Sequence, residues 1–236
     1  MNCKKISMAF LLGAALVAAP RSADAQWSTN MIGVAEYDTE NAILLLAGLS
    51  TGPGGQGWSP RFGVQGYYLR YDVGSTDVNV TTIRPYVGMR NSFTGGSASV
   101  NLGYAFSSRE GTDVAGRAII SDRGQGVVLS GGWDYWGTGQ SFGYQLLGSY
   151  NFGADALWTR ARGTVPLSTG ATMQTRIGGE VAFLSGDGYH AWQPGAVLEF
   201  NNRGGRVFGL GAGMKLFDGG DDAFYIKGEF SVPLGR

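Results

Sequence analysis

The chain has 236 residues, of which 43% are hydrophobic, 12% aromatic and only 15% charged, and its formal net charge is zero. A neutral chain lacks the basic footprint of nucleic-acid-binding proteins, so we expect no nucleic-acid partner. Glycine is abundant and proline sparse, a composition that excludes collagen-like and disordered low-complexity chains.

The first 25 residues have the three parts of a secretory signal peptide. Two lysines precede an apolar run over residues 6–19, and an A-x-A cleavage sequence ends at Ala25. The apolar run is too short to favour a membrane-anchoring helix. Cys3 would leave with the signal, so the mature domain, residues 26–236, would contain no disulfide.

The mature sequence reads as one β-strand after another. Apolar or small side chains alternate with polar ones in a period of two, which is typical of strands with two unlike faces. The clearest examples are "TTIRPYVGMR" (81–90), "SASVNLGYAF" (97–106), "FGYQLLGSYNF" (142–152), "LWTRARGTVP" (157–166) and "FYIKGEFSVPL" (224–234). We count about twelve strands, with ten possible, of roughly ten residues each, the length that a tilted membrane strand requires. The sequence therefore predicts an all-β fold, an antiparallel up-and-down transmembrane β-barrel.

Short turn clusters fall at every second connection and are predicted to lie at the periplasmic end. They are residues 94–96, 138–140, 168–170 and 203–205. The longest connection, residues 108–124, is predicted at the outer end, where such barrels carry their longer loops. Residues 51–60, "TGPGGQGWSP", are longer than a periplasmic turn should be, so either a strand boundary lies elsewhere or that turn is elaborated.

In a membrane barrel the apolar face contacts lipid and the polar face lines the lumen. Residues of mixed charge occupy the polar positions of neighbouring strands, and they predict an inward cluster that narrows the lumen without catalysing a reaction. Its candidate members are Trp158, Arg160, Arg162, Arg176, Glu180, Glu199, Lys227 and Glu229. The alternative is a secreted β-sandwich that carries these charges on its surface.

Signals for catalysis are weak. His190 is the single histidine, and we interpret it as a strand-end residue near the membrane interface. A lipid-modifying barrel enzyme would instead need a serine and an acid beside it. Residues 217–222, "FDGGDD", lack the spacing of a calcium loop, and residues 209–215, "GLGAGMK", lack the ending of a phosphate loop. We therefore expect no catalytic residues, no metal and no cofactor.

Four stretches together resemble the cellulose biosynthesis protein BcsS family. They are "EYDTENAILLLAGL" (36–49), "DRGQGVVLSGGWDYW" (122–136), "GSYNFGADALWTRARGTVPL" (148–167) and "IGGEVAFLSGDGYHAWQPGAVLEF" (177–200). The last includes the "GDxY" hairpin of that family. The resemblance would cover most of the mature chain, although residues 81–93, "TTIRPYVGMRNSF", are more generic than the family pattern.

The resemblance implies an exported barrel in the outer membrane of a Gram-negative-type bacterium. It would be a non-enzymatic accessory protein of cellulose biosynthesis or secretion, with outer-membrane lipid and cellulose or cellulose-export components as partners. Two alternatives remain open: a small porin-like channel and a lipid-modifying barrel enzyme.

Overall fold

The computed structural model describes residues 27–113, 116–136, 142–170, 172–186, 189–202, 204–218 and 221–234. The strands within them are β1 (Trp27–Asp38), β2 (Ile43–Pro53), β3 (Gly57–Val73), β4 (Thr76–Phe93), β5 (Gly96–Thr112), β6 (Ala118–Tyr135), β7 (Gly143–Asn151), β8 (Ala156–Thr169), β9 (Met173–Gly186), β10 (Tyr189–Asn202), β11 (Val207–Phe217) and β12 (Ala223–Leu234). Each strand pairs with its neighbours in the sequence, and β1 pairs antiparallel with β12, which closes the barrel. The predicted antiparallel up-and-down barrel is confirmed. The expected signal peptide, residues 1–25, lies outside the described residues.

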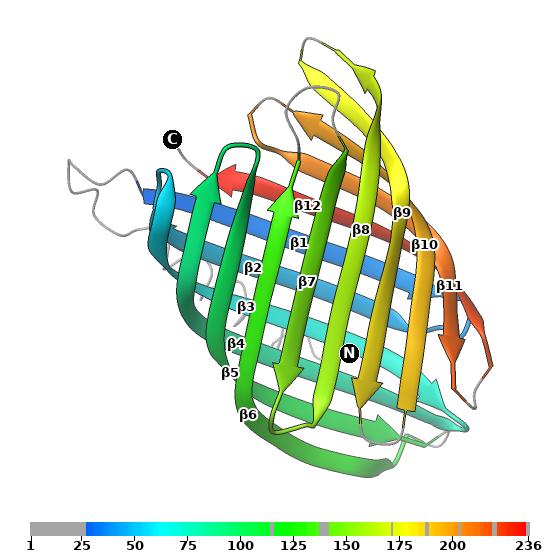
Figure 1. Ribbon diagram of the computed structural model, residues 1–236. Coiled ribbons are helices and arrows are strands. Elements are labelled where there is room, and N and C mark those ends of the chain that lie inside the picture. Colours follow the sequence, from blue (N-terminus) through cyan, green and yellow to red (C-terminus); the bar gives the residue numbers. More distant parts are fainter. Residues whose placement is uncertain are drawn as a thin grey trace.

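The strands are strongly tilted. Figure 1 shows β7 to β10 running steeply across the front of the barrel, while β12, β1 and β2 cross behind them at a large angle. Tilt of this kind accompanies the closure of a sheet into a barrel. Strands on opposite walls therefore cross one another over the interior.

Several strands are longer than the ten residues expected. β4 and β6 have 18 residues each, while β7 has nine. The prediction of a long outer loop at residues 108–124 is wrong, because β5 continues to Thr112 and β6 begins at Ala118. Arg109 pairs with Asp122 in this extended hairpin. Polar residues occupy both faces there, so the alternation that marks a half-buried strand is missing from the sequence.

The connection between β2 and β3 is also shorter than the sequence suggested. β2 continues to Pro53 and β3 begins at Gly57, so the strand boundary, and not an elaborated turn, explains the pattern. Gly55 and Gly57 have positive φ angles of 121° and 88°, which glycine adopts without a steric penalty. The predicted turn at residues 138–140 lies outside the described residues.

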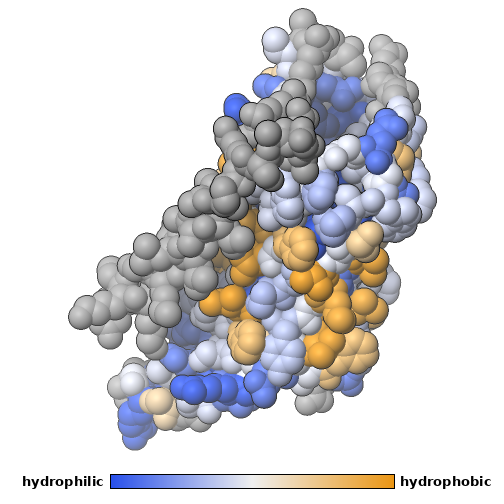
Figure 2. All heavy atoms as spheres, turned by 90° about the vertical axis from the view of Figure 1, so that its left-hand side faces the viewer, coloured by the Kyte–Doolittle hydropathy of each residue, from blue (hydrophilic) through white to orange (hydrophobic). Residues whose placement is uncertain are grey.

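The outer surface of the barrel is apolar. Ile226, Phe224 and Leu210 point outward with 64%, 63% and 59% of their surface exposed. Figure 2 shows apolar residues gathered across the middle of the visible face, with hydrophilic residues above and below them. An apolar band between polar ends is the surface that a bilayer-spanning barrel presents to lipid.

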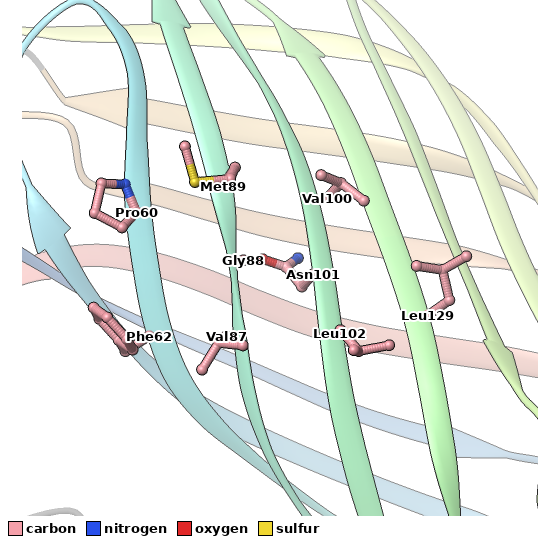
Figure 3. Close-up of a pocket in the computed structure, with 9 residues that line it drawn as sticks. All are labelled: Pro60, Phe62, Val87, Gly88, Met89, Val100, Asn101, Leu102 and Leu129. Atoms are coloured by element: carbon pink, nitrogen blue, oxygen red, sulfur yellow. The ribbon is translucent and has the colours of Figure 1, made fainter.

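On this surface, apolar side chains of β3 to β6, among them Phe62 and Leu102, line an open hollow of about 440 Å³ (Figure 3). The surface that lines this hollow is almost entirely apolar, so the hollow is part of the lipid-facing surface. The part of the chain that the structure describes holds no helix with the length and hydropathy of a membrane span.

Candidate functional site: the lumenal ion-pair cluster

β8 directs its arginines into the barrel. Val165 and Leu167 are exposed on the outer face, whereas Arg162 and Thr164 are buried on the inner face. The alternation follows from the pleat of the strand, in which successive side chains point to opposite sides. The inner face of β8 thus carries arginine at two alternate positions, Arg160 and Arg162.

Arg162 lies at the centre of a group of three carboxylates. Its Nη2 donates to Oε2 of Glu180 at 2.7 Å, and its Nη1 donates to Oε1 of Glu199 at 2.8 Å. Nη1 also donates to Glu229. Only 4% of the Arg162 side chain is exposed. A guanidinium group suits this position, because its five N–H donors fan out in one plane and can reach several acceptors at once.

Two further cations complete the group. Nη1 of Arg160 donates to Oε2 of Glu229 at 3.0 Å, and Lys227 forms an ion pair with Glu180. We call Arg160, Arg162, Glu180, Glu199, Lys227 and Glu229 the lumenal cluster. The charges of its three cations and three carboxylates sum to zero. Their mutual attraction offsets the free-energy cost of removing charged groups from water.

The lumenal cluster crosses the interior. β8 and β12 are separated by β9, β10 and β11 in the barrel order, yet Arg160 and Arg162 both reach Glu229 on β12. Lys227 on β12 likewise reaches Glu180 on β9. The side chains therefore bridge walls that share no backbone hydrogen bonds, and they occupy the lumen between those walls.

The two remaining candidate residues, Trp158 and Arg176, lie beside the cluster. Cζ of Arg160 is 5.9 Å from the centre of the Trp158 ring, within the range of a cation–π contact. Arg176 is buried, and its Nε and Nη2 donate to the hydroxyl and the carbonyl oxygen of Thr164 at 2.9 and 3.0 Å. Arg176 thus ties β9 to β8 at the edge of the cluster.

A glycine permits the close approach of β8 and β9 at this point. A Cβ atom on Gly178 would collide with the backbone of Gly163 and Thr164. Gly178 lies between the inward residues Arg176 and Glu180 on β9. The missing side chain therefore allows Glu180 to reach Arg162 across a tightly packed strand pair.

The sequence analysis missed a second ion-paired group. Nζ of Lys215 on β11 lies 2.8 Å from Oε1 of Glu36 and 2.6 Å from Oδ2 of Asp38, both on β1. Gln193 donates to Glu36 at 3.3 Å. The two acids at alternate positions of one strand were a usable signal, since they had to share a face. Lys215 ends a glycine-rich segment in which it is the single charged residue, so no sequence pattern indicated its partners.

The arrangement is suited to holding structure in place. Each carboxylate of the lumenal cluster forms an ion pair with at least one cation. Among the described residues no group of three or more histidine, cysteine, aspartate or glutamate side chains could hold a metal ion.

His190 lies apart from the lumenal cluster, at the start of β10. It is exposed, and its ring stacks on Phe183 with a centroid distance of 6.2 Å and an angle of 9° between the planes. Trp192 packs on the same Phe183 ring, with a centroid distance of 4.7 Å. Aromatic residues at strand ends are common where a barrel meets the membrane interface.

Solved outer-membrane proteins share this fold. LpxR from Salmonella typhimurium aligns with a TM-score of 0.51 and 12% identity, covering 87% of this chain and 99% of that one. The translocator domain of the autotransporter NalP from Neisseria meningitidis aligns with a TM-score of 0.50 and 10% identity, covering 99% and 98%. At such identities the likeness concerns the fold alone. No curated protein matches the sequence.

The family is shown by the sequence itself. The sequence model of the cellulose biosynthesis protein BcsS family matches residues 20–234, which include all twelve strands of the barrel. The resemblance seen in the four quoted stretches is therefore confirmed. This chain belongs to the cellulose biosynthesis protein BcsS family.

Proposed function

We propose that this protein is a non-enzymatic outer-membrane β-barrel that supports cellulose biosynthesis or secretion, with its lumen obstructed by the lumenal cluster. The observation that carries the proposal is the set of ion pairs between β8 and β12, which crosses the interior of a family member whose outer surface is apolar. Cellulose or the components that export it are the proposed partners.

Location in the outer membrane follows from the physics of the barrel. In a bilayer every backbone polar group needs a partner within the protein, and a closed barrel satisfies that requirement. The pairing of β1 with β12 leaves no open edge, and the outward side chains are apolar. Export would be directed by residues 1–25, so mass spectrometry of the membrane-extracted protein should find Gln26 at its N-terminus. An N-terminus still at Met1 would contradict this route.

A structural role for the lumenal cluster is supported by how its groups are engaged. A general base needs a pKa near the working pH and access to the proton it removes. Glu180 and Glu229 each contact two cations, and 2% and 12% of their side chains are exposed. Such carboxylates hold strands together and are poorly placed for turnover.

The experiment is a deletion of the gene in its host, followed by measurement of deposited cellulose and of the protein in membrane fractions. We expect the deletion to lower cellulose deposition and the wild-type gene to restore it. The variant Arg162→Ala/Glu229→Ala, which removes one charge of each sign, should restore it incompletely. Arg70→Ala/Asp77→Ala, which removes an exposed ion pair, is the matched control and should restore it fully.

Unchanged cellulose in the deletion strain would contradict the proposed role. Recovery of the protein in the soluble fraction would contradict its location. Turnover of a lipid substrate by the purified barrel would contradict the non-enzymatic assignment.

A further inference from the structure

The lumen wall formed by β3 and β4 is basic, in contrast to the neutral lumenal cluster. Arg61 on β3 and Arg84 and Arg90 on β4 share the inward face with Gly63 and Gly88. In the register of the two strands, Arg90 pairs with Ser59 and Arg61 with Gly88, so these two arginines are diagonal neighbours. Arg84 follows farther along the same face. We call Arg61, Arg84 and Arg90 the arginine wall.

The arginine wall is hydrogen-bonded to neutral groups. Arg61 donates to the Ser50 hydroxyl and Arg84 to the Gln65 side-chain oxygen. Nη2 of Arg90 donates to the Ser97 hydroxyl at 3.2 Å. Within the part of the chain that the structure describes, none of the three guanidinium groups forms an ion pair with a carboxylate. No contacting carboxylate therefore balances the positive charges of the wall.

One carboxylate faces the same region. Asp134 on β6 lies opposite Ser97 of β5 in the strand register, and the side-chain amide of Gln145 donates to it. Three arginines against one carboxylate leave the wall with an excess of two positive charges. An excess of one sign in a narrow interior attracts ions of the other sign, since low-dielectric walls focus the field.

Two polar atoms on this wall lack a partner. Nε of Arg90 and Oδ1 of Asn101 are buried and form no hydrogen bond. Arg90 pairs with Ser99 and Gly88 pairs with Asn101, so the two atoms belong to adjacent inward positions of β4 and β5. Gly88 makes the room for them, because a Cβ there would collide with the Asn101 side chain. Since protein atoms enclose both of them, a ligand in the lumen would contact Arg90 through its outer guanidinium nitrogens.

We propose that the arginine wall binds a small oxyanion of the phosphate type. Its oxygens would accept from the guanidinium groups of Arg61 and Arg90, which can form strong bidentate contacts with an oxyanion. Such a ligand would balance the excess positive charge of the wall. Gln145 accepts a hydrogen bond from Arg160 and donates one to Asp134, so it connects this wall to the lumenal cluster. The proposal does not depend on the role in cellulose biosynthesis.

The experiment is equilibrium dialysis of radiolabelled inorganic phosphate against the folded barrel in detergent at low ionic strength. We expect saturable binding of one phosphate per chain. Arg61→Gln/Arg84→Gln/Arg90→Gln should weaken it by about tenfold or more. Asp134→Asn removes the opposing carboxylate and should tighten binding several-fold. Arg70→Gln, on the exposed end of β3, is the matched control and should leave binding unchanged.

A single substitution keeps the test sharp should the triple variant fail to fold. Arg90→Lys preserves the charge but replaces the bidentate guanidinium group with a single ammonium group, so it should weaken phosphate binding several-fold while the barrel still forms. Absence of saturable binding, or binding equal in the wild type and Arg90→Lys, would overturn the proposal. Competition of phosphate binding by a neutral cello-oligosaccharide at low concentration would also overturn it, in favour of a glycan site.

Discussion

Arg162 and Glu229 form an ion pair across the lumen, although three strands separate β8 from β12 in the barrel. The contact brings two walls together through side chains alone. Arg162 also holds Glu180 and Glu199, so a single guanidinium group joins β8, β9, β10 and β12. Removing one partner of such a group leaves a buried charge without a counter-charge. This destabilises a protein far more than replacing the whole ion-paired group with apolar side chains would.

Loss of one carboxylate of the lumenal cluster should destabilise the barrel strongly. Glu180→Gln removes the negative charge that contacts Arg162 and Lys227, in a side chain only 2% exposed. We expect the free energy of unfolding to fall by about 3–5 kcal/mol, the usual cost of an uncompensated buried charge. The measurement is equilibrium unfolding by urea in lipid vesicles. Asp77→Asn, which breaks an exposed pair with Arg70, should cost less than about 1 kcal/mol. Equal losses in the two variants would show that the lumenal cluster is solvated.

A charged side chain on the lipid-facing surface should destabilise the barrel more, the closer it lies to the middle of the bilayer. Leu102 is outward on β5, where it pairs with Val87 and Leu129 of the flanking strands. Leu102→Arg should lower the free energy of unfolding, measured in vesicles, by about 2–4 kcal/mol. Ser108 has the same parity on the same strand but lies toward its end, so Ser108→Arg should cost no more than about 1 kcal/mol. A reversed order of the two costs would contradict the position of the bilayer.

The close approach of β8 and β9 should tolerate no side chain at Gly178. Gly178→Ala places a methyl group against the backbone of Gly163 and Thr164, which side-chain rotation cannot relieve. We expect a loss of about 1–3 kcal/mol in the free energy of unfolding. Gly228→Ala on β12, where an added Cβ meets no atom within 4 Å, should change it by less than about 0.5 kcal/mol. Similar unfolding curves for the two variants would contradict the tight contact.

The sequence predicted the barrel and the orientation of its faces because apolar and polar residues alternate along every strand segment that has one face against lipid. Val100, Leu102 and Phe106 alternate with smaller or polar neighbours, and all three are exposed on the outer wall. The same signal failed at Arg109 and Asp122, where the hairpin of β5 and β6 has polar residues on both faces. Strand parity also placed Arg160 and Arg162 on the inner face.

The partners of those arginines were harder to predict. Glu180 was a candidate because β9 follows β8 and pairs with it. The contact of Arg162 with Glu229 depends on how opposite walls approach across the lumen, which strand order and register do not contain. The pairing of Lys215 with Glu36 and Asp38 arises in the same way, from β11 reaching past β12 to β1.

The conductance of the purified barrel in planar bilayers tests the obstruction of the lumen most directly. We predict that the wild type conducts little, because the lumenal cluster fills the interior between β8 and β12. Arg162→Ala/Glu229→Ala removes one charge of each sign and should raise the conductance several-fold, whereas Arg70→Ala/Asp77→Ala should leave it unchanged. A large, steady conductance of the wild-type barrel would contradict the account and identify the protein as a channel.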